Sequence, residues 1–180
     1  MSMFPIASYT APSGGSGGTI SFTSIPQTFT HLELRLFGRT LNSSGTNYTA
    51  YFNFNADSGA NYSRHILRGD GASASSDLSA ASTASPWLCG VSLPSNTQTS
   101  GVFGVSISQI LDYTNTSKNK TIKNLSGYDN NGNGMVSLSS SAWYNTAAIN
   151  QITIIPDGGG FTQYSRIDLY GIQTSNATGA

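Results

Sequence analysis

Charge is scarce in this sequence. Only 9% of its 180 residues are charged, and 8 Lys and Arg balance 8 Asp and Glu, so the formal net charge is zero. Ser, Thr, Asn and Gly supply the polarity instead. A neutral chain has no long-range field that attracts a polyanion, so we expect neither a nucleic acid nor an anionic membrane surface as a partner.

Cysteine is nearly absent too. Cys89 is the single cysteine, which excludes an internal disulfide and a structural zinc site. In "PWLCGVSL" it lies among apolar residues, and we expect a small buried side chain rather than a reactive thiol. The start, "MSMFPIASYT", has no basic segment and no apolar run typical of a signal peptide, and no transmembrane helix is predicted. We therefore expect synthesis in a cytoplasm without export.

Residues arranged for catalysis are also missing. His31 and His65 fall on separate segments, and the Asp residues are spread singly, several of them in turn-like contexts. Two carboxylates that converge in space, as in a glycosidase, stay open at this level. No G-x-S-x-G motif is present. We expect no catalytic residue, no cofactor and no metal site, and so a protein that is not an enzyme.

Strand patterns fill the chain. In "THLELRLFGRT", Leu32, Leu34 and Leu36 alternate with polar residues, which predicts a half-buried strand. In "NYTAYFNFNADSG" one face holds Tyr48, Ala50, Phe52 and Phe54, and "NYSRHILRGDG" follows as its expected hairpin partner. The closing segment "FTQYSRIDLYGIQ" separates Ile167, Leu169 and Gly171 from Arg166, Asp168 and Tyr170.

Further strand patterns recur about every ten residues, separated by Gly, Asn, Pro and Ser clusters. They are "WLCGVSL", "GVFGVSISQIL", "NKTIKNLSGYD", "GMVSLSSSAWY" and "INQITIIP". The best helical candidate, "SSDLSAAS", is short and weakly amphipathic. We predict an all-β fold, an antiparallel two-sheet sandwich with jelly-roll topology, as one domain over residues 1–180. Residues 1–10 are a candidate N-terminal arm, and residues 173–180 a flexible tail.

Two loop motifs invite a functional interpretation. "DNNGNGM", residues 129–135, has the composition of a calcium loop, but no bidentate Glu follows it, so we expect a tight hairpin. "RGD", residues 68–70, is an integrin motif when a loop displays it, but a match of three residues is expected to be a chance turn.

A resemblance extends over roughly residues 9–172. The segments "SIPQTFTHLELRL", "GANYSRHILRGDG", "ISQILDYTNTSKNKTIKNLSGYDNNG" and "YSRIDLYGI", taken as a set, resemble small structural proteins of tailed bacteriophages, including cyanophages. The resemblance implies a virion component without enzymatic activity: a capsid decoration (cement) protein, or a module of a head fibre or tail fibre. It implies no catalytic or ligand residues for this chain.

Between these roles the sequence favours cement. It has neither a repetitive shaft nor a heptad run, both common in fibres. We expect a homotrimer that binds the major capsid protein on the outside of the head and stabilises the shell. Met3, Phe4, Pro5 and Ile6 are the candidate partner interface, either as a docking arm or as the first strand of the sandwich itself. Trp87 and Trp143 are expected in the core.

The alternative role is receptor binding. Tyr-rich loops such as "DYTNTSKNK" and "AWYNTAA" suit host surface glycans, because aromatic and amide side chains stack on and hydrogen-bond sugars. The same residue types also occur on ordinary β-sandwich surfaces.

Overall fold

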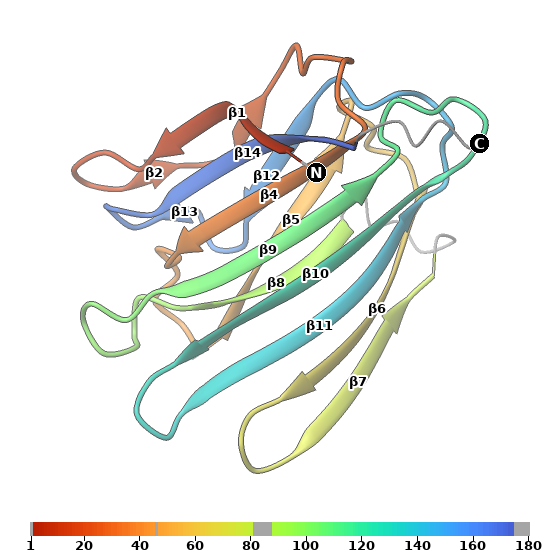
Figure 1. The fold of residues 1–180 in the computed structure, drawn as a ribbon. Coiled ribbons are helices and arrows are strands. Elements are labelled where there is room, and N and C mark those ends of the chain that lie inside the picture. The colour runs from red at the N-terminus through yellow and green to blue at the C-terminus, as the bar shows by residue number, and fades with distance from the viewer. Residues whose placement is uncertain (1, 46, 81–87, 175–180) are drawn as a thin grey trace.

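The structure is a computed structural model that describes residues 2–45, 47–80 and 88–174. The described residues form strands and loops without a helix, and Figure 1 shows their arrangement. The strands are β1 (Ser2–Thr10), β2 (Ser16–Gly17), β3 (Ile20–Phe22), β4 (His31–Gly38), β5 (Asn47–Phe54), β6 (Tyr62–Gly69), β7 (Ala74–Ser79), β8 (Leu88–Pro94), β9 (Gly104–Leu111), β10 (Lys120–Asp129), β11 (Gly134–Trp143), β12 (Ile152–Pro156), β13 (Gly160–Phe161) and β14 (Arg166–Gln173).

Two antiparallel sheets form the layers of a sandwich. The larger sheet has eight strands in the order β1-β14-β4-β9-β10-β11-β6-β7, and the smaller has four in the order β3-β12-β5-β8. A short ladder of β13 and β2 lies beside them. In Figure 1 the larger sheet is in front, and β8 is seen behind it between β9 and β10. β8 packs against β10 and β11. The predicted antiparallel two-sheet sandwich is confirmed. The finer prediction of a jelly roll is not confirmed. A jelly roll has eight strands in its two sheets together, whereas here the larger sheet alone has eight.

Apolar residues at alternate positions form the core between the two layers. From the larger sheet, Leu32, Leu34 and Leu36 on β4 are at most 2% exposed. Ile167 and Leu169 on the neighbouring β14 are fully buried. From the smaller sheet come Ala50, Phe52 and Phe54 on β5 and Ile152 and Ile154 on β12, all fully buried. The faces predicted for these β4, β5 and β14 residues are confirmed.

The predicted hairpin between β5 and β6 is wrong. β5 pairs with β12 and β8 in the smaller sheet, whereas β6 pairs with β11 and β7 in the larger one. The turn-forming residues between them, around Asp57, carry the chain from one layer to the other. The helical candidate "SSDLSAAS" is also corrected, because Ala74–Ser79 is the edge strand β7. Composition alone does not distinguish a tight turn within one sheet from a crossover between two sheets.

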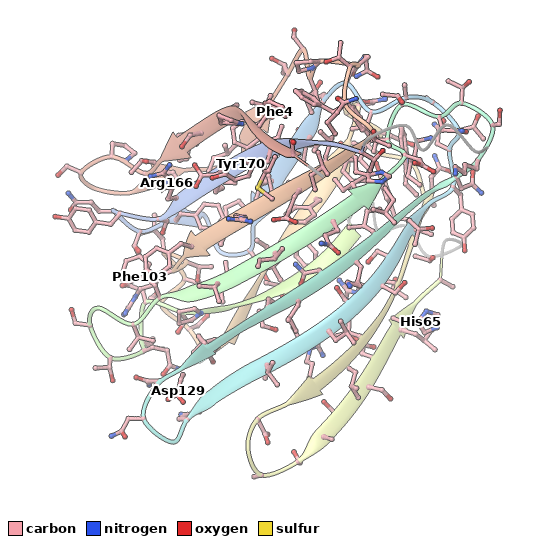
Figure 2. The ribbon with its side chains drawn as sticks, viewed as in Figure 1. Phe4, His65, Phe103, Asp129, Arg166 and Tyr170 are labelled. Atoms are coloured by element: carbon pink, nitrogen blue, oxygen red, sulfur yellow. The ribbon has the colours of Figure 1, made fainter. Side chains whose placement is uncertain are left out.

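The motif at residues 129–135 is a hairpin turn, as predicted. Asn130 N donates to the carbonyl oxygen of Asn133 at 2.9 Å, and Asn131 N donates to Asp129 Oδ1 at 2.8 Å. Asn131 and Gly132 both have positive φ, which a two-residue turn between twisted antiparallel strands requires. Figure 2 labels Asp129 at this end of the β10–β11 ribbon. The "RGD" residues run from the end of β6 into the turn that joins β6 to β7.

Two buried cations hold the long loops. The Arg39 guanidinium donates to three carbonyl oxygens of the β8–β9 loop at 2.6 to 2.9 Å. Lys120 is 1% exposed. Its ammonium donates to two carbonyl oxygens of the β9–β10 loop and to one of the loop after β11, at 2.7 to 3.0 Å. Burial lowers the pKa of both groups. These carbonyl cages explain how charges without carboxylate partners are accommodated inside the molecule.

For residues 1–10 the sequence leaves a docking arm and a first strand of the sandwich open, and for residues 173–180 it predicts a flexible tail. Residues 2–10 form β1, an edge strand of the larger sheet paired with β14, so the structure places Met3, Phe4, Pro5 and Ile6 in the sandwich's own sheet. Gln173 is the last residue of β14, and Thr174 N donates to Thr30 Oγ1. Residues 175–180, Trp87 and the side chain of Cys89 lie outside the described residues. Trp143 is buried in the core, as predicted.

Candidate interaction surface

The larger sheet has an inner face toward the smaller sheet and an outer face away from it. On β9, β10 and β11 the polarity of these faces is inverted from the usual arrangement over the middle of each strand. The inner face carries small polar residues that are at most 3% exposed: Ser106, Ser108, Asn124, Ser126, Ser137, Ser139 and Ser141. The outer face carries aliphatic ones. In a soluble β-sandwich the aliphatic side chains normally lie inside, so this inversion marks the outer face as unusual.

We call the outward aliphatic set the aliphatic face. Its members are 45% to 64% exposed and lie on β6, β7, β9, β10 and β11: Leu67, Leu78, Val105, Ile107, Leu111, Leu125, Val136 and Leu138. Six of them lie in two adjacent rows, whereas a polar row that contains Gln109 separates Leu111 from these six and ends in Leu78. Scattered exposed apolar residues are normal, but six neighbours on one sheet face are typical of an interaction site.

Four of the eight members form a row across four neighbouring strands. Ile107 pairs with Leu125, Leu125 with Leu138, and Leu138 with Leu67. Directly paired side chains on one face of a sheet are in contact, so the four residues make a continuous ridge. The next row holds Val105, Gly127, Val136 and Gly69 in the same strand order. Its two glycines leave gaps on β10 and β6 beside the exposed Val105 and Val136, and we call this row, which is lower than the ridge at those two strands, the strip.

Large inward residues at the strand ends explain why the register holds. Ile110 and Ile122, paired across β9 and β10, are fully buried, and Trp143 at the end of β11 is 1% exposed. They share the inward parity of the serines. A slip of one residue would bury the leucines but would expel these larger side chains from the core. The register therefore follows the strand ends, and the serines between them are buried as a consequence.

Hydrogen bonds stabilise the buried polar residues. The Asn124 amide nitrogen donates to the hydroxyl oxygens of Ser106 and Ser108 at 2.5 and 2.7 Å. Ser137 Oγ lies 2.9 Å from Ser126 Oγ and 3.0 Å from Ser92 Oγ, which joins β8 to the larger sheet. These bonds offset the desolvation of the hydroxyls that make them, whereas Ser139 Oγ and Asn124 Oδ1 are buried without a hydrogen-bond partner among the described residues. Small side chains also allow β8 to pack closely on β10 and β11.

A hollow of about 860 Å³ lies over one end of the aliphatic face. Leu67, Leu78 and Leu138 line it, together with His65 and Lys123. Figure 2 labels His65, which lies on β6 near the edge strand β7. The hollow is open to solvent and mostly apolar, so it extends the aliphatic face into a concave surface rather than forming an enclosed pocket.

The remainder of the outer face, on β4 and β14, is charged and aromatic. Arg35 Nε donates to Glu33 Oε1 at 2.9 Å, and its guanidinium lies 5.2 Å from the centre of the Tyr170 ring. Arg166 Nε donates to both carboxylate oxygens of Asp168 at 2.9 Å. Figure 2 labels Arg166 and Tyr170 on this side of the sheet. Each cation here has its own carboxylate, so this half of the face is polar but locally neutral.

The candidate interface residues lie at the β1 edge, away from the aliphatic face. Met3 and Phe4 are 41% and 45% exposed, and Phe4 stacks on Phe29 with ring centres 5.8 Å apart. Ile6 is half-buried against the core, and the pairing with β14 shifts between Pro5 and Ala7. A partner role for these four residues stays a prediction.

The two histidines lie far apart. His31 is on β4 and His65 on β6, with three strands between them. His31 Nδ1 accepts the backbone N–H of Asp112 at 2.9 Å. Asp70 binds the backbone N–H groups of its own turn, and these hydrogen bonds lower the pKa of its carboxyl. Within residues 2–45, 47–80 and 88–174, no three His, Cys, Asp or Glu side chains lie close enough to hold a metal ion. The described part of the chain also has no helix with the length and apolar character that a membrane crossing needs.

Comparison with protein-family models, with curated proteins and with solved structures found no match to this chain. The fold and the surface are therefore the basis for a functional proposal, together with the resemblance described above.

The aliphatic face was not predicted from the sequence. Alternation in "GVFGVSISQIL" and "GMVSLSSSAWY" shows that Val and Leu share one side and Ser the other, but a single strand does not indicate which side is buried. One signal was present. Trp143 is the largest apolar residue of "GMVSLSSSAWY" and has the parity of its buried serines, whereas "GVFGVSISQIL" has Phe103 on one side and Ile110 on the other and gives no such signal.

Proposed function

We propose that this chain is a structural protein of a bacteriophage virion, a capsid decoration protein whose homotrimers bind the major capsid protein on the outside of the head. In this proposal the trimers sit at or near threefold positions and hold neighbouring capsomers together. The protein is made in the host cytoplasm, assembles onto the particle there and acts without catalysis, metal or cofactor.

The aliphatic face is the observation that carries the proposal. Eight half-exposed aliphatic side chains on a rigid sheet are costly in water, so the arrangement suits a protein whose working state is an assembly. A sandwich with hydrogen-bonded sheets gives a stiff platform on which such a surface keeps its shape.

Composition and symmetry support the same role. Zero net charge removes the self-repulsion that would oppose dense packing of copies on a shell. Three linked copies that meet three matching capsid sites gain avidity without new contacts, and a closed cyclic trimer on a threefold axis satisfies each copy alike. The resemblance to small virion proteins of tailed phages points to the same class.

Particles that lack the protein test the proposal. They should assemble but rupture at lower temperature or milder osmotic shock than complete particles, and adding purified protein back should restore their tolerance. Electron cryomicroscopy of complete particles should place the protein on the outer head. If it sits only at the tail tip, or if deficient particles are equally robust but fail to adsorb, the decoration role is wrong. Reproducible glycan binding would then favour the receptor-binding alternative.

A further inference from the structure

We infer that the aliphatic face is a self-association surface, covered in the working protein by further copies of this chain that pack sheet against sheet. The inference rests on the proposed function in one respect, since it names a surface through which copies of the proposed decoration protein associate. A self-complementary face joins copies in twofold pairs, so the proposed trimer needs a separate contact. The inference assigns self-association to β6, β7, β9, β10 and β11, and not to Met3, Phe4, Pro5 and Ile6 on β1.

The size of the face fits a protein interface. Eight aliphatic side chains, each about half exposed, offer an apolar area on the order of several hundred Å², the range that marks interaction sites on soluble proteins. A stable interface buries roughly 800 Å² from each partner, including a polar rim. Phe37, stacked on Phe103 with ring centres 4.9 Å apart, extends the face on the β4 side. The row of Gln109, Lys123, Ser140 and His65, on the side of the ridge away from the strip, supplies polar residues.

The relief of the face suits a copy of itself. The ridge of Ile107, Leu125, Leu138 and Leu67 runs beside the lower strip that contains Gly127 and Gly69. When two sheets pack face to face at about 10 Å, side chains of one layer fit between those of the other. Ridge side chains of one copy can therefore fit the gaps at Gly127 and Gly69 in the strip of another, and a surface with both features can be complementary to itself.

The charges around the face also favour a neutral partner. None of its eight members is ionisable, and the charges on β4 and β14 are already paired within the chain. Lys123 and His65 lie in the adjoining row, with Gln109 and Ser140. This row also contains Leu78, which pairs with His65, so Lys123 lies among members of the face, where its side chain can extend its ammonium into water. A strongly charged partner would find no counter-charges here, whereas a second copy brings none.

The edges of the larger sheet favour association through the face. β1 contains Pro5, which lacks a backbone N–H, and its pairing with β14 is interrupted by a bulge between Pro5 and Ala7. Both features oppose addition of a further strand. The opposite edge strand, β7, has six residues and is the shortest strand of this sheet. Strand addition is thus discouraged at β1 and limited at β7.

Oligomeric state, measured by sedimentation and light scattering over a range of concentrations, tests the inference. The wild-type protein should be oligomeric. The double variant Leu125→Ser with Leu138→Ser should raise the dissociation constant at least about a hundredfold and stay monomeric where the wild type is assembled. The matched control, Met3→Ser with Phe4→Ser, also removes two exposed apolar side chains and should assemble like the wild type.

A second variant guards against misfolding of the first. A Cβ at Gly69 would contact only Val136 Cγ1, at 3.7 Å, so the monomer has room for a side chain there. Gly69→Val should fold with an unchanged far-ultraviolet circular dichroism spectrum and yet weaken association at least about tenfold, because it fills the strip that receives the partner's ridge. If the double serine variant does not fold, the association of Gly69→Val alone tests the inference.

The outcomes separate this inference from the proposed function. A wild-type protein that is monomeric at every concentration overturns the inference, as does an oligomer that both face variants leave unchanged. Twofold dimers that the face variants dissociate would support the inference and contradict the trimer. Trimers that are lost only in the Met3 and Phe4 variant would overturn the inference and leave the proposed trimer intact.

Discussion

Asp57 shows how a single carboxylate can organise a crossover between the two sheets. Trp143 Nε1 donates to its Oδ2 at 2.8 Å, Asn61 Nδ2 donates to the same atom at 2.9 Å, and Gly59 N donates to Oδ1 at 2.8 Å. Burial raises the pKa of the Asp57 carboxyl, but these hydrogen bonds and one with Asn145 outweigh burial and leave the pKa below its ordinary value. The ionised form of Asp57 therefore stabilises the chain where it leaves β5 for β6.

The pH dependence of stability follows from that lowered pKa. A carboxyl whose pKa is lower in the folded than in the unfolded state contributes stability above the unfolded pKa, and the contribution is lost as pH falls through the folded value. Asp57→Asn should lower the free energy of unfolding by roughly 1–3 kcal/mol at pH 7, since it weakens hydrogen bonds to a charged group. Urea unfolding at pH 7 and at pH 3 measures this, and an equal loss at both values would contradict the assignment.

Neighbouring residues on β4 differ sharply in the expected effect of substitution. Leu34 is 1% exposed, so Leu34→Asp buries a charge in the core and should prevent soluble expression. From the sequence, Arg35→Ser is expected to be nearly silent. The structure adds an ion pair with Glu33, itself 5% exposed, so we expect a measurable loss of less than about 1 kcal/mol. Expression yield and thermal unfolding of both variants check this, and reversed effects would place the strand one residue out of register.

At the scale of elements, the sequence predicted strands better than it predicted their partners. The faces of β4, β5 and β14 followed from alternation, because each has large apolar residues on one side and polar ones on the other. Alternation is just as clear on β9 and β11, but there Ser alternates with aliphatic residues, and the aliphatic side is the exposed one. The buried side is set by Trp143 and Ile110 at the strand ends. Sheet membership of β5 and β6 depended on a crossover that local composition does not reveal.

The inverted faces of β11 give a direct prediction for the free energy of unfolding. Ser137→Leu places a large side chain where Ser92 and Ser126 now pack, so it should destabilise the fold by roughly 1–3 kcal/mol. In the monomer, Leu138→Ser should change stability by less than about 0.5 kcal/mol, because the outer face is solvated there. Chemical unfolding of both variants in the Gly69→Val background checks this. The opposite order would mean that β11 presents the other face to the core.

At the scale of the whole molecule, the chain combines a buried core that needs no disulfide with an apolar outer face. With Cys89 as the single cysteine, the melting temperature should be the same with and without reductant. Differential scanning calorimetry under both conditions measures it. A large shift would indicate an intermolecular disulfide and would contradict assembly in a reducing cytoplasm.

The central claim is that Leu125 and Leu138 point away from the core and are covered by other copies of the chain. Methyl NMR with a soluble paramagnetic agent tests both parts in one measurement. At a concentration where sedimentation shows Gly69→Val to be monomeric and the wild type to be assembled, the agent should broaden the methyl signals of Leu125 and Leu138 in the variant and spare those of Leu32 and Leu34. In the assembled wild type all four residues should be protected. Protection of Leu125 and Leu138 in the monomer, or their broadening in the assembled wild type, would contradict the account.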